Sequence, residues 1–169
     1  RSGEFMVGVC TGSDSLDTDL QSEVLTHEAM VIIPSGCEQI AYPSKGELPV
    51  ITIEDYSGAW RSFQDEVRRL RIRRVVSLES FFSVAQMAIA GFGHGMVPIG
   101  VAKTLKVPKH CLINLGEQGL MRPVRFVARK STYSLPVVGN FYQSLVEFYW
   151  LCLEHILFLC FQLHQYFVY

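Results

Sequence analysis

The residues with the widest chemical range in this 169-residue chain are its cysteines and its five histidines. The cysteines are odd in number, scattered and without Cys-x-x-Cys spacing: Cys10, Cys37, Cys111, Cys152 and Cys160. Neither a disulfide framework nor a zinc ribbon is indicated, and no base stands beside a nucleophile. The sequence therefore predicts no enzyme, no catalytic residue, no metal and no cofactor. We expect these cysteines to stay reduced, as in the cytoplasm, and to act as small buried apolar side chains.

A glycine-rich segment at 91–95 reads Gly-Phe-Gly-His-Gly, which resembles the start of a nucleotide cradle. It follows an expected helix and enters an expected strand, the reverse of the order that a dinucleotide fingerprint requires. A helix end with a tight turn is therefore the favoured interpretation. We expect His94 to face solvent in this turn, with a ligand contact as the alternative.

Polar residues and backbone groups at the ends of two apolar runs, 6–10 and 50–53, are the best candidates for binding. Glu54 and Asp55 directly follow the run 50–53, and their carboxylates would repel an anion bound there. Either the ligand is cationic or zwitterionic, or these acids point to solvent, which we favour. The candidate ligand contacts are Thr11, Gly12, Ile53, Glu54, Tyr56, Ser57 and Gly93.

Strands and helices alternate along most of the chain, which predicts an α/β architecture with a largely parallel sheet. Apolar runs predict strands at 6–10, 24–34, 50–53, 72–76, 95–97, 111–115 and 124–129. Helical periodicity predicts helices at 59–70, 78–90, 99–105 and 136–148, the second of them capped by Ser77. The helix at 78–90 is apolar on most sides and should be buried or lie in an interface.

The net charge of −1 conceals a strong segregation of charge. Residues 1–60 carry 10 acids and 2 bases, residues 61–130 carry 4 acids and 13 bases, and residues 131–169 carry 2 acids and no base. This pattern indicates either an anion-binding middle segment or, as we favour, oppositely charged solvated faces. The arginines between 68 and 74 would then contact the acidic first third, within the chain or across a dimer.

The C-terminal segment is far more apolar than the rest, because 21 of residues 141–169 are hydrophobic. Its length is compatible with a membrane span. Glu154 and His155 lie inside it and no Lys or Arg flanks it, so a span is not favoured.

The segment 75–105 resembles the LysR-type transcriptional regulators. The resemblance rests on a strand, a helix containing Met87, the glycines Gly91 and Gly93, two apolar residues and Pro98, followed by another helix. The strands at 7–12 and 25–34 and the basic strand at 124–130 fit the same family, so the likeness extends over about residues 6–148.

The resemblance implies an effector-binding domain with a two-lobed fold like that of periplasmic binding proteins, with lobe II complete and lobe I partial. Residues 1–5 read as a cloning remnant, 6–34 as partial lobe I with a crossing strand, and 35–124 as lobe II. Residues 125–149 would return to lobe I, and 150–169 form an atypical hydrophobic tail. The chain then looks like an N-terminally truncated member of the family.

The function implied is sensing of a small-molecule effector in the cleft between the lobes, in order to modulate transcription. The partners implied are further copies of the chain, in a homodimer or a tetramer, and DNA through an N-terminal domain absent from this chain. The helix at 78–90 is our candidate for the dimer interface, and no membrane contact is expected. The alternative is an interaction or membrane-tethered fragment dominated by the tail.

Overall fold

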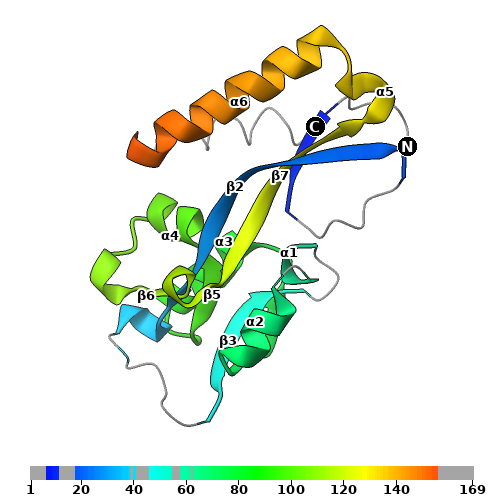
Figure 1. Ribbon diagram of the computed structural model, residues 1–169. Coiled ribbons are helices and arrows are strands. Elements are labelled where there is room, and N and C mark those ends of the chain that lie inside the picture. Colours follow the sequence, from blue (N-terminus) through cyan, green and yellow to red (C-terminus); the bar gives the residue numbers. More distant parts are fainter. Residues whose placement is uncertain are drawn as a thin grey trace. The chain divides into compact units, whose positions relative to one another are not determined.

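A computed structural model describes residues 7–11, 18–38, 40, 46–54, 58–61 and 63–155 (Figure 1). Its contacts divide the chain into two compact units. The first unit takes the described residues within 1–10, 14–26 and 125–169. The second unit takes Thr11 and the described residues within 27–124.

The second unit is built on a mixed sheet. Strand β3 (Leu48–Ile53) is parallel to β4 (Ile72–Leu78) and to β5 (Gly95–Pro98). The long strand β2 (Leu20–Ile33) runs antiparallel to β5 and to the short β6 (Ile113–Asn114). The expectation of a largely parallel sheet is therefore wrong in detail, because the strand that enters this unit runs against the three that follow.

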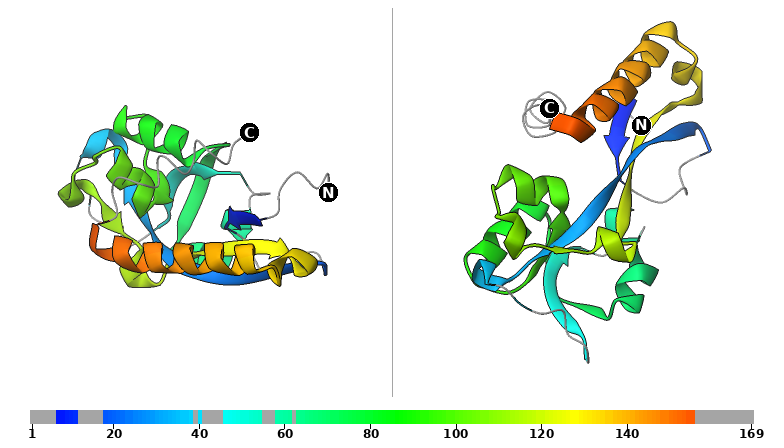
Figure 2. Two further views of the ribbon diagram at one scale, coloured as in Figure 1. Left: turned by 90° about the horizontal axis from the view of Figure 1, so that it is seen from above. Right: turned by 60° about the vertical axis from the view of Figure 1, so that its left-hand side comes forward.

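Helices cover both faces of this sheet. Helices α1 (Gly58–Arg61) and α2 (Gln64–Arg69) lie on one face, and α3 (Phe81–Ile89) and α4 (Ile99–Thr104) lie on the other (Figure 2, right). Along β2, Met30 and Ile32 join the core under α2, whereas Val31 and Ile33 join the core under α3. A strand buried on both faces reads as an unbroken apolar run, which explains the sequence pattern here.

The helix expected at 59–70 is broken into α1 and α2. Phe63 has φ −136° and ψ 19°, which is not helical. The rings of Trp60 and Phe63 meet edge to face with centroids 5.6 Å apart, and both side chains are buried. The break therefore lets both aromatic residues enter the same core.

Helix α3 begins three residues later than the sequence predicts. Ser77 remains in β4, where it is the register partner of Thr52, and the cap is Ser80, whose hydroxyl oxygen accepts from the Phe82 N–H at 3.2 Å. The sheet pairing of Ser77 outweighs its capping preference, and the next serine with extended backbone takes the cap.

Short 3₁₀ turns complete the second unit, namely η1 (Ser35–Cys37), η2 (Lys109–Cys111) and η3 (Gly116–Gln118). The strand expected at 111–115 is reduced to β6, because Cys111 closes the turn η2.

The first unit joins β1 (Val7–Cys10) to β7 (Met121–Arg129) in antiparallel pairing, followed by α5 (Lys130–Tyr133) and α6 (Pro136–His155). Phe126 and Ala128 of β7 pack against Val138 and Leu145 of α6. The Phe126 ring also lies 5.3 Å from that of Tyr142, centroid to centroid. The strand order through the whole sheet is β1-β7-β2-β5-β3-β4.

Within the described part of the chain, no helix is both long and apolar enough to cross a membrane. Helix α6 is longer than the predicted 136–148 and takes in the start of the predicted tail. Residues 156–169 lie outside the described residues.

Candidate functional site

One edge of the second unit gathers strand ends and helix starts. Because β3, β4 and β5 are parallel, their carboxyl ends at Ile53, Leu78 and Pro98 share an edge, which we call the carboxyl edge. Helices α3 and α4 begin just beyond it. Ligands of open α/β sheets bind outside the carboxyl ends of the strands. The carboxyl edge is therefore the candidate site.

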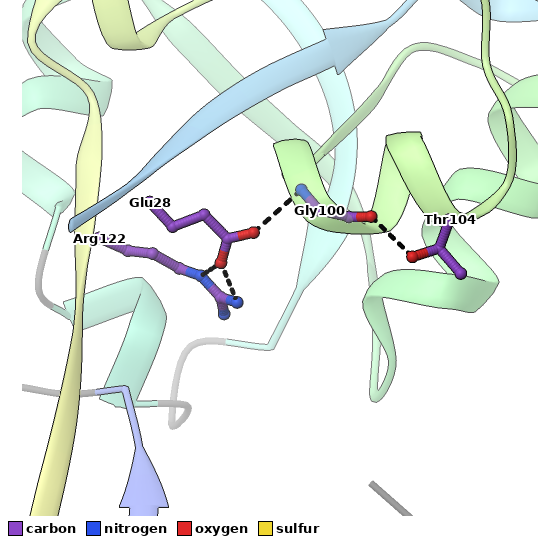
Figure 3. Close-up of polar contacts among 4 residues, drawn as sticks. All are labelled: Glu28, Gly100, Thr104 and Arg122. Atoms are coloured by element: carbon purple, nitrogen blue, oxygen red, sulfur yellow. Dashed lines mark hydrogen bonds and ion pairs between the residues drawn. The ribbon is translucent and has the colours of Figure 1, made fainter. Parts of the chain in front are cut away.

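Glu28 reaches this edge from β2. Met30 is the register partner of Pro98, which brings the residues before Met30 beside the start of α4. One carboxylate oxygen of Glu28 accepts from the Gly100 N–H at 2.9 Å (Figure 3). The N–H groups at a helix start attract negative charge, so Glu28 takes the place that an external anion would occupy there.

The second carboxylate oxygen of Glu28 binds Arg122 of β7. It accepts from Nε at 3.0 Å and from Nη2 at 2.6 Å. The side chains retain only 16% exposure at Arg122 and 21% at Glu28. The Arg122 guanidinium also lies 5.3 Å from the centroid of the Phe81 ring at the start of α3. The pair thus joins β2, β7, α3 and α4 at one point.

A second arginine, Arg74 of β4, reaches the end of β3. Arg74 Nη1 donates to the Ile53 carbonyl at 3.5 Å, and its guanidinium carbon is 4.7 Å from the Trp60 ring centroid. The Ile53 side chain itself is 5% exposed and points into the core. The backbone carbonyl of Ile53, and not its side chain, therefore contacts the Arg74 guanidinium. Glu54, the next residue, is half-buried.

The other predicted ligand contacts are distributed differently. Thr11 follows β1 and is half-buried, whereas Gly12, Tyr56 and Ser57 lie outside the described residues. Gly93 precedes the amino end of β5, away from the carboxyl edge. A Cβ there would stand 3.1 Å from Ile51 Cδ1, and its φ is +152°. Close approach and turn geometry account for this glycine.

The glycine-rich segment is a helix end and turn, as predicted. The Gly91 N–H donates to the Ala88 carbonyl at 3.0 Å with Gly91 at φ +87°. The expectation that His94 faces solvent is wrong, however. His94 Nδ1 accepts from the Ser35 N–H at 3.0 Å, and the contact is partly buried. The loop after β2 covers this histidine, which sequence proximity could not indicate.

The basic residues of α2 and β4 make exposed ion pairs. Arg73 Nε lies 3.2 Å from a Glu47 carboxylate oxygen, with both side chains 58% exposed. Arg68 pairs with Asp65 at 3.7 Å. The Arg73–Glu47 pair joins the basic middle segment to the acidic first third within the chain, although exposed pairs of this kind stabilise little.

Sequence reasoning missed Glu28 and Arg122, which are 94 positions apart. The available signal was a charged residue directly before the apolar run 29–33, because a charge that close to a core needs a partner. Among the residues the structure describes, no group of three or more His, Cys, Asp or Glu side chains is arranged to hold a metal ion.

The second unit is an α/β unit with helices on both faces, and the strands β2 and β7 lead from it into the smaller first unit. The sequence matches the model of the LysR substrate binding domain over residues 1–150. The chain therefore belongs to the LysR substrate-binding domain family.

A curated relative supports this assignment. An uncharacterized HTH-type transcriptional regulator of Vibrio cholerae serotype O1 is 27% identical over 135 residues, which are 79% of this chain and 45% of the relative. The chain thus spans less than half the length of this relative.

Solved structures show the same fold. The CcmR regulatory domain of Synechocystis PCC6803, in complex with 2-PG, has a TM-score of 0.60 at 16% identity, over 85% of this chain and 73% of that one. The cofactor-binding domain of the Cbl transcriptional regulator has a TM-score of 0.62 at 19% identity, over 83% and 65%.

These findings confirm the predicted family and the fold, an α/β domain like that of periplasmic binding proteins. The chain is therefore a LysR substrate-binding domain, and its curated relative is a transcriptional regulator. The alternative of a membrane-tethered or interaction fragment finds no support.

Proposed function

We propose that this domain binds a small-molecule effector at the carboxyl edge and thereby modulates transcription by the regulator to which it belongs. The observation that carries the proposal is the family match over residues 1–150. Three structural neighbours were solved with small species bound: CcmR with 2-PG, OxyR2 of Vibrio vulnificus with sulfate, and HypT of Salmonella typhimurium with bromide. These species motivate the first probes.

The charges at the carboxyl edge restrict the effector. The Gly100 N–H at the start of α4 and the Arg122 guanidinium already hold the Glu28 carboxylate. A ligand here meets Glu54 after β3 and the Arg74 guanidinium beside Trp60. We therefore expect an effector that carries both donor and acceptor groups, with the predicted contacts Thr11, Gly12, Tyr56 and Ser57 as further candidates.

The test is a thermal-shift screen of the full chain against sulfate, bromide, small carboxylates, amino acids and organic cations. A ligand at 100 times its Kd adds about 2.7 kcal/mol of stability and raises Tm by several degrees. Glu54→Gln and Arg74→Met should each weaken that shift, whereas Arg73→Met, in the exposed pair, should leave it unchanged. If Glu54→Gln and Arg74→Met both keep the full rise in Tm, the ligand does not bind at the carboxyl edge. If no compound in the screen raises Tm, the proposed effector binding is contradicted.

A second part of the proposal concerns assembly, in which the domain forms a homodimer or a tetramer through α3. Phe82 and Ile89 on this helix are 37% and 39% exposed, and Phe92 just beyond it is 75% exposed. Sedimentation should show a dimer that Phe92→Ser weakens at least tenfold. A dimer that survives Phe92→Ser but dissociates with Val76→Ser would place the interface on the edge strand β4 instead, where Val76 is 42% exposed.

DNA contact, in this proposal, belongs to a part of the regulator outside this chain, and the protein acts in the cytoplasm. DarR of Vibrio fischeri, another structural neighbour, was solved in complex with DNA. Isolated residues 1–169 should show only weak, salt-sensitive DNA binding. Sequence-specific binding by this chain alone would contradict this part.

A further inference from the structure

Two thiols, Cys37 and Cys111, lie at neighbouring ends of paired strands in the second unit. Ile32 of β2 is the register partner of Ile113 of β6. Cys111 closes the turn η2 two residues before Ile113, and Pro34 directly follows the last residue of β2. The turn η1 then folds back on that position, because the Cys37 N–H donates to the Pro34 carbonyl at 2.9 Å.

The two side chains share one apolar cluster. Cys111 is 6% exposed and belongs to the core beneath α3 and α4, and Cys37 packs against the same core. Burial raises the pKa of the Cys37 thiol, and the negative charge of a Cys111 thiolate raises it further.

Cys37 differs from Cys111 in access and in backbone conformation. It is half-buried, with part of its surface open to solvent. Its φ is +57°, in the left-handed region that L side chains rarely adopt, directly after Gly36 at φ +63°. The turn thus holds a partly accessible thiol against the core to which the buried Cys111 belongs.

We propose that Cys37 and Cys111 form a reversible disulfide site that reacts with low-molecular-weight disulfides. The Cys37 thiolate attacks one sulfur of the small disulfide, whose S–S bond breaks to release one small thiolate. The Cys111 thiolate then attacks the Cys37 sulfur of the mixed disulfide and releases the second small thiolate. The protein loses two electrons and its two thiol protons, and the small disulfide is reduced to two thiols.

The proposed bond would tie the end of β2 to the turn before β6 and would enclose the 73 residues from 38 to 110. Its formation should be slow at neutral pH and faster as pH rises, because the attacking species is the thiolate and the Cys37 pKa is raised. The competing interpretation is that both cysteines serve only as small apolar side chains.

The experiment uses the full chain with oxidised glutathione, followed by thiol counting and by mass spectrometry of proteolytic peptides. It is run on the unsubstituted chain and on Cys10→Ser/Cys152→Ser/Cys160→Ser, which keeps only the two thiols of interest. We expect a linked Cys37–Cys111 peptide, no retained glutathione on the triple variant and a rise in Tm of about 10 °C. Dithiothreitol should remove the linked peptide and return Tm to its value before oxidation.

Two single variants in the triple-variant background separate the steps. Cys111→Ser should stop at a mixed disulfide on Cys37, and Cys37→Ser should leave Cys111 unmodified while the chain is folded. The proposal is overturned if the folded triple variant keeps a stable glutathione adduct on Cys37, if it does not react, or if the linked peptide forms only in urea. None of these outcomes bears on effector binding, so the two proposals stand or fall separately.

Discussion

Glu28 on β2 and Arg122 on β7 form a partly buried ion pair, in which Arg122 Nη2 lies 2.6 Å from the Glu28 carboxylate while Gly100 donates to its other oxygen. Arg122 and the start of α4 together satisfy both carboxylate oxygens. Removal of either charge leaves the other in a partly desolvated place without its partner.

Arg122→Met should therefore destabilise the domain by about 2 kcal/mol. The Glu28 carboxylate would remain partly buried without its partner, and its desolvation penalty exceeds the net stabilisation that the ion pair provides. Glu28→Gln combined with Arg122→Met should cost less than the sum of the single changes. Urea unfolding of the four proteins in the cycle gives the coupling energy.

The matched control for this cycle is Arg73→Met. Arg73 and Glu47 are also an ion pair at short distance, but each side chain is 58% exposed. We expect a change below about 0.5 kcal/mol. Equal losses at Arg73 and Arg122 would show that burial does not decide the strength of these pairs.

Gly95→Ala should destabilise the second unit by about 1–3 kcal/mol, because the added methyl group overpacks a closed core. A Cβ at Gly95 would stand 2.8 Å from Ala88 Cβ and 3.0 Å from the Val84 carbonyl oxygen. Helix α3 packs directly on β5 at this point. Thermal unfolding followed by circular dichroism measures the loss.

Gly139→Ala is the comparison for Gly95→Ala. Gly139 lies in α6, and among the described residues no atom beyond its chain neighbours and the backbone of its own helix stands within 4 Å of a Cβ built there. We expect a gain of about 0.5–1 kcal/mol from helix propensity. A loss at this position would mean that the α6 surface is covered there.

Ser80→Ala should cost about 1 kcal/mol, because it leaves the Phe82 N–H without the acceptor at the start of α3. Ser77→Ala should cost little, since Ser77 is exposed in β4. The free energies of unfolding of the two variants decide which serine caps the helix. A larger loss at Ser77 would restore the sequence-based assignment.

The stability of the first unit should fall at alkaline pH through Tyr133. Burial, followed by the nearby Glu23 charge, raises the pKa of Tyr133 above its ordinary value of about 10. The folded state then holds the phenol proton when the unfolded state has released it. The contribution of Tyr133 to the free energy of unfolding is fully present below about pH 10, and it is lost as pH rises through the pKa of Tyr133 in the folded state.

The measurement for Tyr133 is a set of urea unfolding curves between about pH 8 and 11, with phenol ionisation followed by ultraviolet absorbance. Tyr133→Phe should flatten the alkaline part of the curve, although Cys37 and Cys10, whose pKa values are also raised by burial, retain a smaller slope. An unchanged slope in Tyr133→Phe would contradict the assignment.

Much of the fold was predictable from short sequence patterns. The apolar run at the end of β2 and the β-branched run of β3 are strands because both faces of the sheet are buried. Gly91 ends α3 as expected, since only a residue tolerant of positive φ suits that position. Patterns of this kind act over a few residues and need no knowledge of distant partners.

Several details could not be predicted, because they depend on contacts with residues that are distant in the sequence. Ser77 and Ser80 are equally good caps by type, and the pairing of Ser77 in β4 decides between them. The split between α1 and α2 depends on a core that accepts both Trp60 and Phe63. His94 is covered by Ser35, 59 positions away.

The sequence by itself determined the family, the α/β class and the positions of the main strands and helices, because periodicity, propensity and the motif at 75–105 are local properties. Tertiary structure alone decided that β2 runs against β5, that the Glu28 carboxylate fills the start of α4 beside Arg122, and that Cys37 shares a core with Cys111. Each of these three features forms only when segments that are distant in the sequence meet in the folded chain. The free energy that stabilises it comes from contacts between those segments, which no local pattern reports.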